Sequence, residues 1–225
     1  MKKISINNLV EFRSKSPKSK HSFAADLKSG KEKVSTGKGG NYWVSCVSAI
    51  NKSYKLNDFQ PLANKRDELA KKSEETSYKR TLVMYKRNID ILYTFEKFDL
   101  EKWRPSKKIE YIRKPKEYST LTIKELQIQV NPNYIFRFKK DGIEEIGAIW
   151  FIAKINGFKK EELGMFADIL YRFLDFYYSE KYVINPQYCI AVDLFNGSDI
   201  NYLHLKDGKT LKILDSILDE IKELR

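Results

Sequence analysis

One pair of apolar segments constrains the fold of this chain more than any other feature. Residues 134–138 alternate apolar and polar side chains, and residues 146–152 are almost wholly apolar. Asp141-Gly142 lies between them, and this dipeptide is a strong signal for a two-residue hairpin turn. Because a strand that is apolar at nearly every residue must be covered on both faces, we expect residues 146–152 to form a central strand.

The segments around this hairpin predict a mixed sheet. Residues 126–130 alternate like a half-buried strand, residues 188–194 are typical of a second buried strand, and residues 200–205, which include His204, follow an Asn196-Gly197 turn signal. Apolar residues recur at helical spacing in residues 42–54, 58–72, 77–98, 159–178 and 211–224. This order predicts a three-layer α/β fold, with a mixed central sheet, flanking helices and a helical region before the sheet.

Charge divides the chain unevenly. The net charge is +12, yet the first 125 residues hold 29 basic and 15 acidic residues, and residues 126–225 hold 13 and 15. We expect a basic flexible arm at residues 1–40 with one short ordered element at 4–12, a helical region with a basic block at 41–118, and an α/β core at 119–225. The excess positive charge favours nucleic acid as a partner, although a lysine-rich solvated surface gives the same composition.

Residues 102–116 form the basic block, in which seven Lys or Arg residues accompany a single Glu. Trp103 and Tyr111 interrupt it, and they either stack on unpaired bases or anchor the block to the core. Lysine and arginine side chains neutralise phosphates and release counterions. The candidate phosphate contacts are Arg104, Lys107, Lys108, Arg113, Lys114 and Lys116.

Residues 130–154, VNPNYIFRFKKDGIEEIGAIWFIAK, resemble the hairpin that carries the metal-binding carboxylates of the PD-(D/E)XK nuclease superfamily. The order of elements in about the last 110 residues is also similar to that superfamily's core. The resemblance implies a restriction-endonuclease-like core with an Asp at the start of the second strand and an acid, a spacer and a Lys at the end of the third. Two such carboxylates hold a divalent metal that activates water.

In this chain those positions fall on Pro132-Asn133 and on Ile152-Ala153-Lys154. Asn133 and Ile152 replace both carboxylates, and only Lys154 is kept. Because an amide carries no charge and isoleucine has no ligand atom, we expect no catalytic residue and no metal site. Mg²⁺ would be needed only if another acid, such as Asp193 or Glu96, had moved into the site. Residues 147–149 and 189–197 are also similar to a group of uncharacterised bacterial proteins.

The sequence therefore predicts a non-catalytic nucleic-acid-binding protein, for DNA or RNA, on a degenerate PD-(D/E)XK-like scaffold. Such a protein would suit a bacterial defence or mobile-element system. One alternative is a metal-dependent nuclease with a relocated active site. Another is a protein-interaction or regulatory subunit whose C-terminal acids face a protein partner. These acids are Asp215, Asp219, Glu220 and Glu223.

We expect a cytoplasmic protein without cofactors and without membrane contact. No run of eighteen apolar residues is present, and no apolar stretch follows the opening Met-Lys-Lys. Cys46 and Cys189 are far apart and have no metal-binding spacing, which is typical of a reduced compartment.

Overall fold

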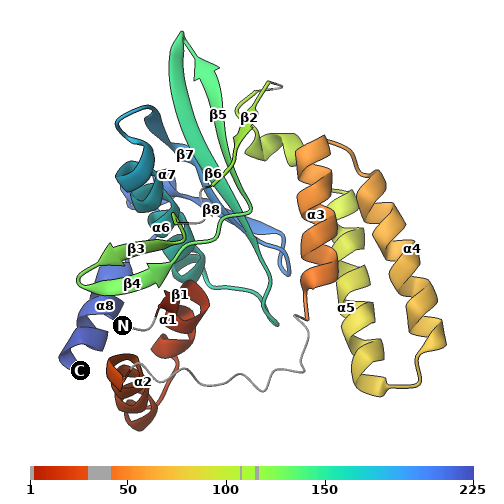
Figure 1. The fold of residues 1–225 in the computed structure, drawn as a ribbon. Coiled ribbons are helices and arrows are strands. Elements are labelled where there is room, and N and C mark those ends of the chain that lie inside the picture. Colours follow the sequence, from red (N-terminus) through yellow and green to blue (C-terminus); the bar gives the residue numbers. More distant parts are fainter. Residues whose placement is uncertain (1–2, 30–41, 107, 115–116) are drawn as a thin grey trace.

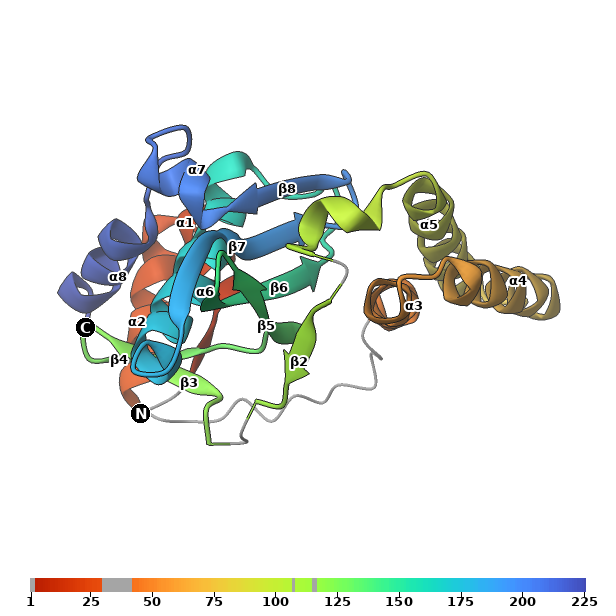
Figure 2. The same ribbon diagram turned by 90° about the horizontal axis from the view of Figure 1, so that it is seen from above.

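The computed structural model describes residues 3–29, 42–106, 108–114 and 117–225 (Figure 1). These residues form a mixed α/β protein in which helices cover both faces of a five-stranded sheet, as Figure 2 shows from above. The expected three-layer arrangement around a mixed sheet is therefore confirmed at this level.

The central sheet has the strand order β2-β5-β6-β7-β8, in which β6 and β7 are parallel and all other neighbours are antiparallel. Its strands are Glu110–Ile112 (β2), Tyr134–Lys140 (β5), Ile143–Ile152 (β6), Val183–Asp193 (β7) and Ser198–Asn201 (β8). Helix α6 (Lys160–Tyr178) makes the crossover between the parallel pair. The apolar run of β6 lies at the centre, as its composition predicts.

The predicted hairpin joins β5 to β6. Asp141 has a φ of 51° and Gly142 a φ of 82°, so both turn residues are left-handed. A two-residue turn of this kind matches the twist of the flanking strands, and aspartate and glycine are the residues that adopt it most readily.

We name the two sides of the central sheet the α6 face and the α3 face. The α6 face carries α6, a second sheet and the helices from both ends of the chain. The second sheet has the order β1-β4-β3, with strands Ile4–Ser5 (β1), Leu126–Gln129 (β4) and Thr120–Ile123 (β3). The other helices are Ile6–Arg13 (α1), Pro17–Ser29 (α2), Tyr202–Lys206 (α7) and Leu214–Glu223 (α8).

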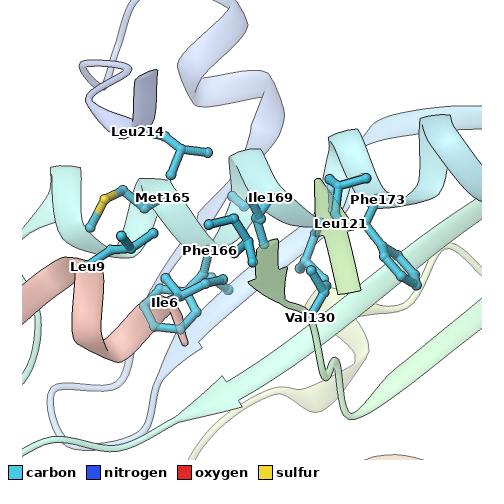
Figure 3. Close-up of a cluster of buried hydrophobic side chains, with 14 of the residues drawn as sticks. Ile6, Leu9, Leu121, Val130, Met165, Phe166, Ile169, Phe173 and Leu214 are labelled. Atoms are coloured by element: carbon cyan, nitrogen blue, oxygen red, sulfur yellow. The ribbon is translucent and has the colours of Figure 1, made fainter. Parts of the chain in front are cut away.

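Figure 3 shows how side chains from α1, α6 and the second sheet meet in one cluster on the α6 face. Leu9 of α1 lies beside Met165, and Phe166 lies between α1 and Val130. These side chains are almost wholly buried. Burying each large apolar side chain contributes about 1.5–3 kcal/mol, so the N-terminal helix is an integral part of this core.

The α3 face carries a separate helical unit. Its helices are Val44–Leu56 (α3), Gln60–Glu75 (α4) and Lys79–Glu96 (α5), followed by a 3-10 helix at Leu100–Trp103. Both views place α3 nearest the sheet and α4 furthest from it (Figures 1 and 2). Tyr54, Phe95 and Trp103 from this unit pack against Phe136 and Phe151 of the sheet.

One expectation about the N-terminal region needs correction. The short ordered element predicted at residues 4–12 is present, but residues 17–29 form α2 rather than part of a flexible arm. The apolar residues of this segment are too few to predict a helix from the sequence. In the structure, Ala24 and Leu27 of α2 are buried against the rest of the core. The Gly-Lys-Gly-Gly segment at residues 37–40 lies outside the described residues.

Two strand expectations also need correction. The strand near residues 126–130 pairs with β1 and β3 and not with β5, so it does not belong to the central sheet. The strand expected at residues 200–205 ends at Asn201, because the Asn201 side chain accepts the His204 N–H at 3.2 Å and begins α7. His204 therefore lies in a helical cap, where its role is structural.

Candidate nucleic-acid interface

The positions that the nuclease resemblance singles out lie at one edge of the central sheet. β5 begins at Tyr134, and β6, which runs antiparallel to it, ends at Ile152. Asn133 lies beside the end of β6: its backbone N–H donates to the Ile149 carbonyl at 3.0 Å, and its side-chain oxygen accepts the Phe151 N–H at 2.6 Å. The side-chain amide thus extends the ladder between the strands, which is a task that needs no charge.

Lys154, the lysine that the resemblance singles out, pairs with a carboxylate of the same chain. Ile152 is 7% exposed and packs in the core of the α6 face. Two residues later, Lys154 Nζ lies 3.4 Å from Glu162 Oε2 and 5.1 Å from the centre of the Phe158 ring. Glu162 also accepts the Lys159 N–H at 3.1 Å in the first turn of α6. This single carboxylate is committed to a helix cap, and it does not replace two metal ligands.

The two acids considered as migrated ligands have structural roles. Asp193 is fully buried, and its carboxylate accepts the Phe158 N–H at 2.9 Å and the Phe195 N–H at 3.0 Å. Burial raises the pKa of Asp193. Glu96 pairs with Arg66 between α5 and α4. In the part of the chain that the structure describes, no three His, Cys, Asp or Glu side chains gather as a metal site requires.

Two residues of the basic block hold the structure together. Arg104 Nη1 donates to the Tyr54 carbonyl of α3 at 2.6 Å, and its guanidinium lies 5.4 Å from the centre of the Tyr54 ring. Lys114 Nζ donates at 2.8 Å to the Val130 carbonyl and at 2.8 Å to Asn131 Oδ1. Burial lowers the pKa of Lys114. Both cations connect the basic block to neighbouring segments, so their hydrogen-bonding groups are already engaged within the protein.

The other candidates of the block differ in what the structure says of them. Lys107 and Lys116 lie outside the described residues. Lys108 and Arg113 are exposed, and neither forms an ion pair with any described residue. Arg113 follows directly after β2, whose last residue is Ile112.

The aromatic residues of the block anchor it. Trp103 is 1% exposed and stacks on Phe98, with ring centres 6.0 Å apart. It has no surface to offer a base. Tyr111 is half-buried, and its ring lies 4.9 Å from the Tyr134 ring. The anchoring alternative is therefore confirmed for Trp103.

A groove between α3 and the start of β5 lies beside these residues. We name it the α3 groove. One stripe of α3 forms its wall, and Tyr134 closes the other side while its hydroxyl donates to the Asn51 carbonyl at 3.0 Å. The cavity is about 450 Å³. Its lining is Val44, Val47, Ser48, Asn51, Lys52, Lys55 and Tyr134.

A second hollow continues from the C-terminal end of α3. It is about 520 Å³ in volume, and Leu56, Asn57, Glu101, Arg104 and Ser106 line it. This hollow shares no lining residue with the α3 groove, and Arg104 and Ser106 of the basic block belong to it.

Lys52 and Lys55 are contributions to this surface that sequence reasoning missed. Both are exposed, and no described acid pairs with either of them. The signal was present in the period of α3. Cys46, Ile50 and Tyr54 form its buried stripe, so residues at the same spacing on the other side must face outward. The helical periodicity of α3 could not predict that Tyr134 lies across the groove from it.

The acidic C-terminal helix, by contrast, is mostly engaged within the molecule. Asp215 accepts two bonds from Arg172 of α6, the shorter at 2.6 Å. Glu220 pairs with Lys20 of α2 at 2.7 Å, and Asp219 pairs with Lys124. Among the four acids that could have faced a partner, only Glu223 has no ion pair with a described residue. The partner-facing alternative stays a prediction.

Comparisons with family models, with curated proteins and with solved structures found no match. Within the described residues, no helix has the length and apolar character needed to cross a membrane. The chemistry of the surface therefore carries the functional argument.

Proposed function

We propose that this protein binds nucleic acid without cleaving it, and that the α3 groove and the adjoining basic block form the contact surface. The observation that carries the proposal is the set of exposed cations of the α3 groove and of the basic block that have no acidic partner among the described residues. They are Lys52, Lys55, Lys108 and Arg113. Cations that the fold leaves unpaired along a hollow are available to neutralise phosphates.

The non-catalytic part of the proposal rests on the edge of the sheet beside Lys154. Asn133 is bound to the Phe151 N–H, Ile152 is buried, and Glu162 caps α6. The PD-(D/E)XK resemblance remains part of this proposal. The central sheet supports it, because β2, β5 and β6 are antiparallel neighbours and are followed by a long helix, α6, and a further strand, β7. In the chain, β3 and β4 of the second sheet lie between β2 and β5.

A charge-reversal experiment tests the binding surface. Binding of fluorescently labelled single-stranded and duplex oligonucleotides is measured by anisotropy over a salt series. The test variant is Lys52→Glu/Lys55→Glu, and the matched control is Lys71→Glu/Lys79→Glu, which makes the same change in net charge at exposed positions of the α4–α5 hairpin. We expect the test variant to lower the affinity at least about tenfold and to flatten the salt dependence, whereas the control keeps most of both.

The result that overturns the binding proposal is absent binding, or binding that does not respond to salt. Equal losses in the two variants would assign the effect to net charge and not to this surface. Cleavage in Mg²⁺ or Mn²⁺ that is lost on Lys154→Ala would overturn the non-catalytic part.

A further inference from the structure

We infer that the α3 groove accepts an unpaired nucleobase, so that the preferred ligand is single-stranded nucleic acid. This inference rests on the proposed function, and it goes beyond it because it names the class of nucleic acid and the subsite that selects it. Three features of the groove carry it: its apolar walls, an unused amide oxygen and the cations at its rim.

The walls of the groove are not those of a pure phosphate site. Val44 is 53% exposed, and Val47 and Tyr134 are also partly accessible. A duplex presents mainly charged phosphates and sugars to a protein surface outside its grooves, and these gain nothing from valine side chains. An unpaired base offers an apolar ring face, which gains from contact with aliphatic and aromatic surface.

Asn51 is one of the polar residues that line the groove. Its backbone carbonyl accepts the Tyr134 hydroxyl, but its side-chain Oδ1 is buried without a partner among the described residues. An unpaired buried acceptor costs about 1–3 kcal/mol. Because the terminal torsion of asparagine is broad, the amide can turn toward the groove and offer a donor and an acceptor together. Asparagine pairs with a base edge in this way in nucleic-acid complexes.

The rim of the groove suits the phosphates on either side of that base. Lys52 and Lys55 are three residues apart on α3, so they lie on neighbouring turns of the same side. Helix α3 has 13 residues and is therefore about 20 Å long, which allows a backbone of several nucleotides to follow it.

The size of the groove agrees with this assignment. Its volume of about 450 Å³ falls in the range of about 300–1,000 Å³ for sites that enclose small organic ligands. The lining is mostly apolar, Asn51 belongs to it, and Lys52 and Lys55 supply its cations. A free anion would need only the cations, and an apolar ligand would need only the valines, whereas a nucleotide uses both.

The test compares three ligands of equal length: a single strand, its duplex, and a single strand with consecutive abasic positions. The variant Ser48→Trp fills the groove from an exposed position of α3, so it leaves the core untouched. Asn51→Ala removes the amide but keeps the backbone carbonyl that holds Tyr134. We expect the full-length protein to bind the single strand at least about tenfold tighter than the duplex and the abasic strand, given the usual strength of base contacts.

Ser48→Trp and Asn51→Ala should each reduce single-strand affinity by about fivefold or more, while their affinity for the abasic strand stays unchanged. Equal, salt-sensitive binding of the three ligands, unaffected by Ser48→Trp, would refute the base subsite and leave the proposed function standing. Binding to none of the ligands would refute both. Circular dichroism of each variant checks that the fold is kept, and the abasic strand provides the second control because its binding needs the rim alone.

Discussion

On the α6 face, cations and carboxylates are used up in joining the layers, whereas on the α3 face the cations beside the groove face solvent. Ion pairs connect α2 with α8, α6 with α8, and the β3–β4 turn with α8. At the α3 groove, Lys52 and Lys55 have no described acid to pair with. The difference shows that the excess lysine and arginine side chains are available to a ligand only where the fold places no carboxylate beside them.

The largest expected effect concerns packing on the α6 face. Phe166→Ala should lower the free energy of unfolding by about 3–5 kcal/mol, because the ring is 1% exposed between α1 and Val130. Phe176→Ala on the same helix is the matched control, since its ring is 70% exposed. Urea unfolding followed by tryptophan fluorescence measures both. Equal effects would show that α6 does not pack as described.

The next effect concerns the charge network of the same face. Arg172 holds Asp168 at 2.9 Å, and Asp168 is almost fully buried. Arg172→Met should therefore destabilise the protein by about 3 kcal/mol, because it leaves a buried carboxylate without its counter-ion. Arg137→Met breaks a pair with Glu110 of the edge strand β2, and it should lower the free energy of unfolding clearly less. Similar losses in urea unfolding would remove the contrast between built-in and peripheral charge.

A smaller effect concerns Asn133, one of the positions that the nuclease resemblance singles out. Asn133→Ala should cost about 1–2 kcal/mol, because the Phe151 N–H loses its acceptor. Asn133→Asp keeps an acceptor oxygen and should restore most of that stability. Thermal unfolding of the two variants measures these effects. If neither variant lost stability, the Asn133 amide would have no structural role.

The pair between Asp215 and Arg172 predicts a pH dependence. The guanidinium lowers the pKa of Asp215 below its ordinary value of 3.8. The stabilisation from this pair is therefore complete above pH 3.8 and is lost as the pH falls through the lower pKa of the folded state. Because the pair is partly exposed, Asp215→Asn should cost about 1 kcal/mol at pH 7, and the difference from the wild type should shrink below pH 3.8. A difference that is constant with pH would contradict this.

The smallest expected effect on stability is at the groove itself. Lys52→Ala and Lys55→Ala should each change the free energy of unfolding by less than about 0.5 kcal/mol, since both residues are exposed and unpaired within the described structure. Paired measurements of unfolding and of oligonucleotide affinity sharpen the comparison: loss of affinity without loss of stability marks a binding surface. A marked loss of stability would mean that these lysines support the fold.

Sequence reasoning predicted much of the fold because periodicity was strong where burial was deep. The apolar run of β6, the Asp141-Gly142 turn and the helix that became α6 are local signals that tertiary contacts reinforce. β2 and β3 were missed because each is short and neither shows the clear apolar alternation of residues 126–130. The partners of β4 could not be read at all, since pairing is set by contacts far apart in sequence.

The candidate site was only partly predictable for the same reason. The basic block was visible as composition, but its split into Arg104 and Lys114, which fasten the structure, and Arg113, which faces solvent, depends on acceptors in distant segments. The α3 groove unites residues of α3 with Tyr134, and no local pattern connects them. Burial of Trp103, in contrast, agrees with one of the two alternatives that its position in the block allowed.

The pairing of β1 with β4 has a consequence for how the protein folds. Ile4 lies in register with Ile128, so two segments far apart in the chain must meet before β1 is paired. Closing so long a loop carries an entropic cost and slows folding. Until that pairing forms, the apolar stripe of α1 is exposed to solvent, and chaperone binding or aggregation of partly folded chains should concentrate there.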